Sequence, residues 1–274
     1  MNKRIANSNN ATFETNAKIK LIHGDFYERC NEIPNGSVDL ILTDPPYNTL
    51  SDLHEWDTEI DLDWLETIYS NLLKPTGVVI SFCNLELFFR MYTTFTNKLC
   101  FKHFHIWEKP IGMPINLSRP LPETEFIVVF KQKNTKTSAL TWHPEALGIE
   151  GKPYVKKSNI LESPTRKMKK SAIIINKTGL RYPRTILKAP GKCNLPKKER
   201  TKHPTQKPII LLKRLILAHS NENELVLDPF AGSASTLLAA HDTNRRAIGY
   251  ELMAEYYAMA QARINAYTAQ DELF

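Results

Sequence analysis

The chain has 274 residues, 42% of them hydrophobic and 24% charged, which is typical of a globular protein that can bury a sizeable core. No apolar run reaches the roughly 18 residues that a membrane-spanning helix needs, and the polar, Asn-rich start lacks the apolar segment of a signal peptide. These features exclude a helical membrane protein, and we expect a cytoplasmic location, no membrane partner and a flexible N-terminus over residues 1–17. The net charge is +7.

Strand-length apolar runs alternate with helical patterns along most of the chain. The predicted strands are Lys18–His23, Val38–Thr43, Gly77–Cys83, His105–Trp107, Phe126–Phe130, Leu225–Leu227 and Ala247–Tyr250. The predicted helices are Asp61–Leu73, Pro208–His219, Ser235–His241 and Met253–Tyr267. Continuous apolar runs indicate strands that are covered on both faces, so we expect an α/β fold with a doubly wound, mostly parallel sheet.

The alternation stops near Lys131 and resumes near His203. Residues 18–130 and 203–274 are therefore predicted to form one catalytic domain, and residues 131–202 an insert. Residues 131–203 hold 19 Lys and Arg against 4 Asp and Glu, a net charge of +15, which leaves −8 on the rest of the chain. Such a segment is typical of polyanion binding, although a solvated lysine-rich loop has the same composition.

Cysteines and histidines give no metal site by spacing. The four cysteines are scattered without a CxxC pair, which argues against a disulfide framework or a zinc site. His103 and His105 are spaced to share one face of a strand, but the sequence offers no third ligand beside them. We therefore expect no metal.

The segment Thr43–Asn48 (TDPPYN) follows a predicted strand, and ligands of open α/β sheets bind at the carboxyl ends of strands. An aromatic amine is a poor nucleophile because its lone pair is delocalised into the ring. The Asp44 carboxylate and the Pro45 carbonyl, which the proline pair would fix, could accept the two amino hydrogens and free that lone pair. Tyr47 offers a flat face for a base that has left the duplex. A simple strand-terminating turn explains this motif equally well.

A second constellation follows the short strand Glu224–Asp228. The residues Pro229–Ser235 are mostly small and precede a helix, so that a ligand can approach the backbone at the helix N-terminus. Glu251 ends the next strand, at a spacing that suits hydrogen bonds from ribose hydroxyls. The GxGxxG pattern is absent, which disfavours nicotinamide and flavin cofactors. Helix–strand packing is the alternative reading of the small residues.

TDPPYN together with LDPFAGSAS resembles the amino-methyltransferases of DNA, and the order of the motifs resembles the β class, whose long insert is a target-recognition region. The resemblance covers roughly residues 20–130 and 203–265. It implies a Rossmann-like methyltransferase fold, S-adenosyl-L-methionine as cofactor and DNA as partner. It also implies methyl transfer to N6 of a flipped adenine, because DPPY is commoner there, with N4 of cytosine as the alternative. A homodimer and a cognate restriction endonuclease are further partners that the resemblance leaves open.

Residue by residue, the resemblance implies a catalytic tetrad, a cofactor site and no metal ligand. The catalytic residues are Asp44, Pro45, Pro46 and Tyr47. The cofactor-binding residues are Asp25, Thr205, Lys207, Asp228, Pro229, Phe230, Ala231, Gly232, Ser233 and Glu251. Thr205 and Lys207, in HPTQKP, would hold the carboxylate at the methionine end, and Trp107–Lys109 resembles a WxK stretch near the base pocket. Ala234 departs from the pattern because a second glycine usually stands there, and alanine fits only with a negative φ or a more distant ligand.

Other functions fit the residues less well. No cysteine follows a proline, so the nucleophile for methylation of a ring carbon is missing and direct transfer to an amino nitrogen is favoured. The intact DPPY argues against a catalytically silent DNA-binding protein. Enzymes that act on RNA or on a protein glutamine typically carry NPPY-like tetrads. We also predict that the loop Asn48–Glu59 closes over the flipped base or the cofactor.

Overall fold

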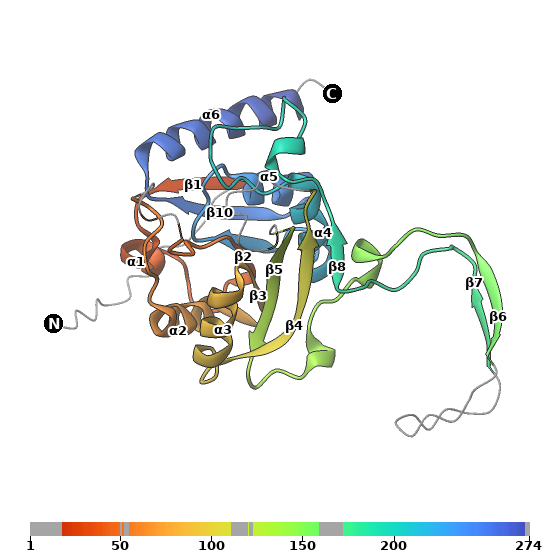
Figure 1. The fold of residues 1–274 in the computed structure, drawn as a ribbon. Helices are drawn as coiled ribbons and strands as arrows, with labels where there is room; N and C mark the ends of the chain where they lie inside the picture. The colour runs from red at the N-terminus through yellow and green to blue at the C-terminus, as the bar shows by residue number, and fades with distance from the viewer. Residues whose placement is uncertain are drawn as a thin grey trace.

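The computed structural model describes residues 18–49, 51, 55–110, 120, 123–158 and 172–271, so the predicted flexible N-terminus 1–17 lies outside the described residues. One large sheet forms the centre of the molecule (Figure 1). Its strands are β1 (Ile19–His23), β2 (Val38–Thr43), β3 (Leu73–Cys83), β4 (Leu99–Glu108), β5 (Thr124–Gln132), β8 (Ile186–Lys188), β9 (Leu225–Asp228) and β10 (Arg246–Glu251). Their spatial order is β1-β10-β9-β2-β3-β5-β4-β8.

The sheet is parallel from β1 through β10, β9 and β2 to β3, where the buried apolar runs lie. Strand β5 then pairs antiparallel with both β3 and β4, and the short edge strand β8 is parallel to β4. The expectation of a mostly parallel α/β sheet is therefore confirmed. Strands β2 and β9 are neighbours although far apart in sequence, and a crevice at their carboxyl ends is where open α/β sheets bind ligands.

Helices cover both faces of the sheet, because each face presents an apolar surface that must be buried. The helices are α1 (Phe26–Arg29), α2 (Leu62–Leu72), α3 (Leu85–Thr94), α4 (Ile209–His219), α5 (Ser235–Asp242) and α6 (Ala254–Asp271). Helices α4, α5 and α6 contribute to one apolar core, and α1, α2 and α3 to the other. Short 3-10 turns occur at Cys30–Glu32, Thr137–Ala139, Pro144–Leu147 and Lys192–Asn194.

Local sequence explains where several helices begin. Asp61 precedes α2 and accepts a hydrogen bond from Trp64 N at 3.0 Å, and Asn84 does the same for Leu87 N of α3 at 2.8 Å. Such N-caps satisfy backbone donors of the first turn that have no helical partner. Pro208, expected at the first position of its helix, instead precedes α4 with an extended backbone.

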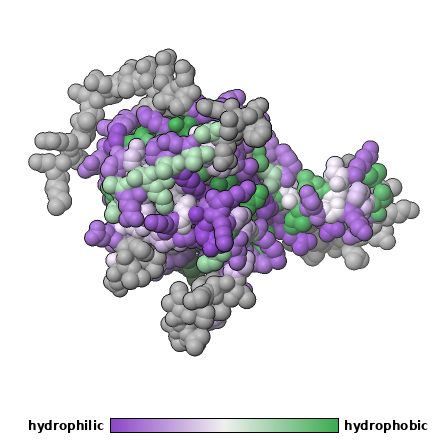
Figure 2. All heavy atoms as spheres, turned by 90° about the horizontal axis from the view of Figure 1, so that it is seen from above, coloured by the Kyte–Doolittle hydropathy of each residue, from purple (hydrophilic) through white to green (hydrophobic). Residues whose placement is uncertain are grey.

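The basic segment 131–202 is less separate from the catalytic body than the sequence indicated. Strand β8 belongs to the main sheet, and Leu140, Leu147 and Leu187 are buried in the core that α4 shares. These leucines are scattered through a lysine-rich segment, so a count of its charges does not reveal that they are buried. The antiparallel hairpin of β6 (Tyr154–Ser158) and β7 (Ala172–Asn176) extends away from the body (Figure 1). From above, it forms a lobe with both hydrophilic and hydrophobic surface (Figure 2).

Candidate active site

A pocket lies at the carboxyl ends of β2 and β9, with a volume of about 1200 Å³ including its open mouth. It is lined by all fourteen residues that the sequence assigned to catalysis and cofactor binding. These are Asp25, Asp44, Pro45, Pro46, Tyr47, Thr205, Lys207, Asp228, Pro229, Phe230, Ala231, Gly232, Ser233 and Glu251. Their individual roles remain predictions, but one concave site brings together segments from both ends of the chain.

Asp44 lies in a compact cluster of charged side chains. Its Oδ2 binds Lys207 Nζ at 2.6 Å, and its Oδ1 accepts a hydrogen bond from the Tyr47 hydroxyl at 2.7 Å. The same hydroxyl lies 2.8 Å from Glu125 Oε1, so its single hydrogen is shared between two carboxylates. Lys207 also pairs with Glu125 at 2.9 Å, and Lys109 binds Glu125 Oε2 at 3.0 Å. Two carboxylates and two ammonium groups thus balance their charges.

Burial and charge together set the protonation of this cluster. Burial raises the pKa of Asp44, with Lys207 opposing that increase and Glu125 adding to it. Burial would also raise the pKa of Glu125, but the ammonium groups of Lys207 and Lys109 bring it below its usual value. The two carboxylates raise the pKa of Lys207 in spite of burial. Glu125 therefore keeps its charge more readily than Asp44, which is the better acceptor for a proton.

The chain after the DPPY tetrad is held by Asp57, a buried residue that no sequence motif marks. Its carboxylate accepts hydrogen bonds from the backbone N–H groups of Tyr47, Asn48 and Thr49 at 2.7, 2.8 and 2.7 Å. Asn48 has a φ of 56°, a left-handed conformation that asparagine tolerates better than most residues. Asp57 thereby fixes the direction in which the chain leaves the Asp44 cluster.

On the other side of the pocket, Glu251 is joined to the loop after β9. Gly232 N donates to Glu251 Oε2 at 2.8 Å, and Met253 N donates to Oε1 at 2.8 Å. Burial raises the pKa of Glu251 to about 7 and that of Asp228 to about 7. Gly232 has a φ of 52°, and a Cβ there would lie 2.9 Å from His203 Nε2.

Ala234 has a φ of 59° and is fully buried at the start of α5. Alanine therefore does not have the negative φ that would avoid backbone strain at this position. A left-handed alanine costs roughly 1–2 kcal/mol, which the tight turn between β9 and α5 imposes. The sequence analysis allowed alanine here with a negative φ or with a more distant ligand. Since φ is positive, we expect the ligand to lie farther from Ala234.

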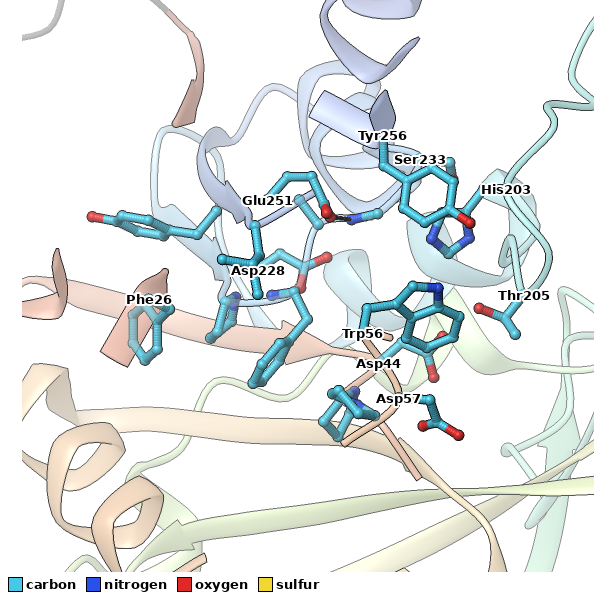
Figure 3. Close-up of a pocket in the computed structure, with 18 of the residues that line it drawn as sticks. Phe26, Asp44, Trp56, Asp57, His203, Thr205, Asp228, Ser233, Glu251 and Tyr256 are labelled. Carbon is cyan, nitrogen blue, oxygen red and sulfur yellow. Dashed lines mark hydrogen bonds between the residues drawn. The ribbon is translucent and has the colours of Figure 1, made fainter. Parts of the chain in front are cut away.

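Three aromatic side chains stand across the pocket from Glu251 and Asp228 (Figure 3). The ring of Trp56 lies 5.9 Å from that of His203, which lies 4.5 Å from that of Tyr256. Trp56 belongs to the predicted closing loop Asn48–Glu59, of which residues 50 and 52–54 lie outside the described residues. Trp56, Tyr256 and Glu125 could not be found from sequence, because each stands alone in a segment without a motif.

The structure adds contacts to one sequence-based expectation and changes another. Lys207, which the sequence assigns to a cofactor carboxylate, contacts Asp44 and Glu125 through its ammonium group, and its contact with the cofactor stays a prediction. The expectation that His103 and His105 have no third ligand nearby is wrong. His219, at the end of α4, places a ring nitrogen within 4.8 Å of one on each of the other two. Trp107 of the WxK stretch is core, and its Nε1 donates to Ala189 O at 3.0 Å.

Comparison with known proteins agrees with this geometry. A family model described as DNA methylase matches residues 38–262. The type II methyltransferase M.HpaI of Haemophilus parainfluenzae is 29% identical over 261 residues, which cover 90% of this chain and 74% of that protein. The DNA adenine methyltransferase YhdJ of Escherichia coli is 29% identical over 271 residues, which cover 92% of this chain and 85% of that protein.

Solved structures give the same result. The crystal structure of the M1.HpyAVI-SAM complex is similar with a TM-score of 0.60 and 30% identity, and the match covers 89% of this chain and 99% of that one. The cytosine-N4-specific PvuII DNA methyltransferase has a TM-score of 0.64 at 17% identity, which shows a shared fold. Fold and site thus define a doubly wound α/β methyltransferase. The chain belongs to the DNA methylase family.

Proposed function

We propose that this enzyme transfers a methyl group from S-adenosyl-L-methionine to the N6 amino group of an adenine in DNA. The observation that carries the proposal is the position of Asp44, which lines the same pocket as Glu251 and the loop of Gly232. The similarity to YhdJ supports the choice of adenine, because YhdJ is a DNA adenine methyltransferase. The similarity to M1.HpyAVI supports the choice of cofactor, because that protein was crystallised as a complex with SAM.

The residues around Glu251 fit such a cofactor. Gly232 combines a positive φ with a close approach to the His203 ring, where a Cβ would lie 2.9 Å from Nε2, so glycine lets this loop pass close to the side chains of the pocket. Each carboxylate oxygen of Glu251 accepts one backbone hydrogen bond and retains a second acceptor position for a ribose hydroxyl. Asp25 lines the same side of the pocket and also caps α1 through Tyr27 N at 2.8 Å. When bound, the cofactor supplies an electrophilic methyl group on a sulfonium sulfur.

Asp44 acts on the base. Its carboxylate accepts a hydrogen bond from the amino group, which draws the nitrogen lone pair out of the ring and toward the methyl group. Methyl transfer would form the N–C bond as the methyl–sulfur bond of the sulfonium breaks and a neutral thioether leaves. The nitrogen would then be cationic and release a proton, which Asp44 is placed to accept and pass to water. The raised pKa of Asp44 suits this step, and the ion pair with Lys207 orients the carboxylate. The Tyr47 hydroxyl fixes the other oxygen of Asp44.

DNA reaches this pocket through the basic segment. The net charge of +15 on residues 131–203 provides attraction to phosphates, and the projecting β6–β7 hairpin could reach a groove. Its exposed Val155 and Tyr154 offer contact area beyond charge alone. The target base must leave the duplex, at a cost of a few kcal/mol, because a stacked adenine cannot reach Asp44. Three further properties remain predictions: a homodimer, a cognate restriction endonuclease and a cytoplasmic location. None of the described helices is long and apolar enough to cross a membrane.

One experiment tests substrate and target together. The enzyme is incubated with mixed-sequence DNA and labelled S-adenosyl-L-methionine, and the DNA is digested to nucleosides. We expect N6-methyl-2′-deoxyadenosine as the labelled product, whereas N4-methyl-2′-deoxycytidine would show that the target is the amino group of cytosine. The Asp44→Ala variant should lose turnover and keep cofactor affinity within about threefold, whereas full activity in that variant would remove the assigned role.

A further inference from the structure

Three histidines form a buried cluster on the α4 face of the sheet, away from the pocket at the ends of β2 and β9. His103 and His105 belong to β4, and His219 is the last residue of α4. One ring nitrogen of each lies within 4.8 Å of one on each of the others. His105 and His219 are 4% and 2% exposed, while His103 is partly exposed and gives access from solvent.

Most ring nitrogens of this cluster lack hydrogen-bond partners among the described residues. Both nitrogens of His105, both of His219 and Nε2 of His103 are buried without a partner. The backbone of Arg184 lies near His105 and favours its charged form, but the two do not form a hydrogen bond of ordinary geometry. Buried polar atoms in proteins are nearly always satisfied, so five such atoms in one place indicate a missing ligand. A metal ion accounts for one nitrogen of each ring, because it can accept a lone pair from all three at one point.

The surroundings of the cluster bear on how tightly it would hold a cation. His219 ends a helix, where the backbone dipole favours a cation. Lys102 and Arg214 are the nearby charges that oppose a cation, so the cluster should hold its metal less tightly than a site with a carboxylate.

We propose that His103, His105 and His219 bind one divalent transition metal, with Zn²⁺ the best match to three imidazoles. The ring nitrogens of a tetrahedral zinc site lie about 3.4 Å apart, so small rotations of the rings would close the cluster around an ion. Water would occupy the fourth position. The metal would join the strand β4 to the end of α4, where Trp142 of the basic segment packs over His219 at 5.0 Å between ring centroids. The role is structural, because the site lies apart from the Asp44 cluster.

Full-length protein without an affinity tag tests the proposal. After treatment with a chelator and reloading, zinc per chain is measured by mass spectrometry, and Co²⁺ is titrated while the visible absorption of tetrahedral cobalt is recorded. We expect about one metal per chain and a rise in Tm on the order of 5 °C at a hundredfold excess over Kd. Absence of stoichiometric zinc and of the cobalt bands would overturn the proposal.

Variants locate the metal. His219→Gln and His103→Asn should each weaken Co²⁺ binding at least tenfold, while His23→Gln, on β1 at the opposite edge of the sheet, should bind as the wild type does. His103 is the most exposed of the three, so its variant remains informative even where His219→Gln fails to fold. Equal binding by wild type and His103→Asn would also overturn the proposal.

Discussion

Replacing Lys207 with methionine removes the ammonium group that lies between two carboxylates. In the native cluster, Lys207 contacts Asp44 at 2.6 Å and Glu125 at 2.9 Å. Lys109 would still pair with Glu125 and keep it ionised, but Asp44 would lose the cation that favours its ionised form and offsets its repulsion by Glu125. We therefore expect the Asp44 carboxylate to be protonated over a wider pH range and to lose its function as an acceptor.

The structure sets the size of this effect. Asp44 Oδ1 and Glu125 Oε1 both bind the Tyr47 hydroxyl, at 2.7 and 2.8 Å, so they are no more than about 5.5 Å apart. Two like charges at that distance repel by about 3 kcal/mol at an effective dielectric constant of 20. This corresponds to roughly a 100-fold decrease in ionisation, and we expect a decrease in kcat on the order of 100-fold at neutral pH.

The assay measures kcat from label transfer and Kd for S-adenosyl-L-methionine by calorimetry. Lys207→Met should lower kcat and change Kd by less than about threefold. The double variant Lys207→Met/Glu125→Gln should have a kcat at least about tenfold higher than Lys207→Met alone, because the repulsion from Glu125 is removed. Lys213→Met, which removes a lysine of α4 that pairs with Asp242, is the matched control. A large loss of cofactor affinity that Glu125→Gln does not rescue would refute this reasoning, because Lys207 would then hold the cofactor itself.

The remaining predictions concern the cofactor loop and the chain after the tetrad. Glu251 has a pKa of about 7, and its ionised form accepts hydrogen bonds more strongly than the protonated form, so cofactor affinity should fall as pH decreases below 7 and level off above it. Calorimetry from pH 6 to 8.5 measures this, and an equally steep profile for Glu251→Gln would contradict the assignment. Asp57→Ala leaves three backbone donors without their acceptor and should lower the free energy of unfolding by about 3 kcal/mol in urea, with Asp57→Asn much milder, and equal losses would point to a different cause. Gly232→Ala forces a left-handed alanine against His203 and should cost about 1–2 kcal/mol in stability and weaken cofactor binding at least tenfold; native affinity in a binding titration would show that the cofactor avoids this loop.

Much of the fold could be predicted because burial leaves a direct record in the sequence. Strand β2 is buried along its whole length, and β9 likewise, so their continuous apolar runs were clear. Strand β8 has three residues with a single buried side chain, Leu187, which is too short a pattern to detect among lysines. Helix α3 was missed although Asn84 caps it, because several of its apolar residues are exposed.

The parts of the candidate site that are contiguous motifs could be predicted from the sequence. The parts that form only through tertiary contacts could not. The tetrad and the Gly232 loop are contiguous in sequence. Glu125 meets Tyr47 across 78 positions, and nothing near it in sequence marks it as a partner of Asp44. His219 and His103, whose ring centroids lie 5.8 Å apart, come together only in the folded chain, and single-sequence patterns do not record that contact.

The pairing of β1 with β10 has a consequence for how the protein is made. Gly24 N donates to Glu251 O at 3.0 Å, so the first and last strands of the sheet meet at the cofactor pocket. On the ribosome, the tetrad emerges long before Glu251, and the pocket cannot close until β10 has been synthesised. A nascent chain that ends before β10 would therefore carry Asp44 without the Glu251 side of the pocket.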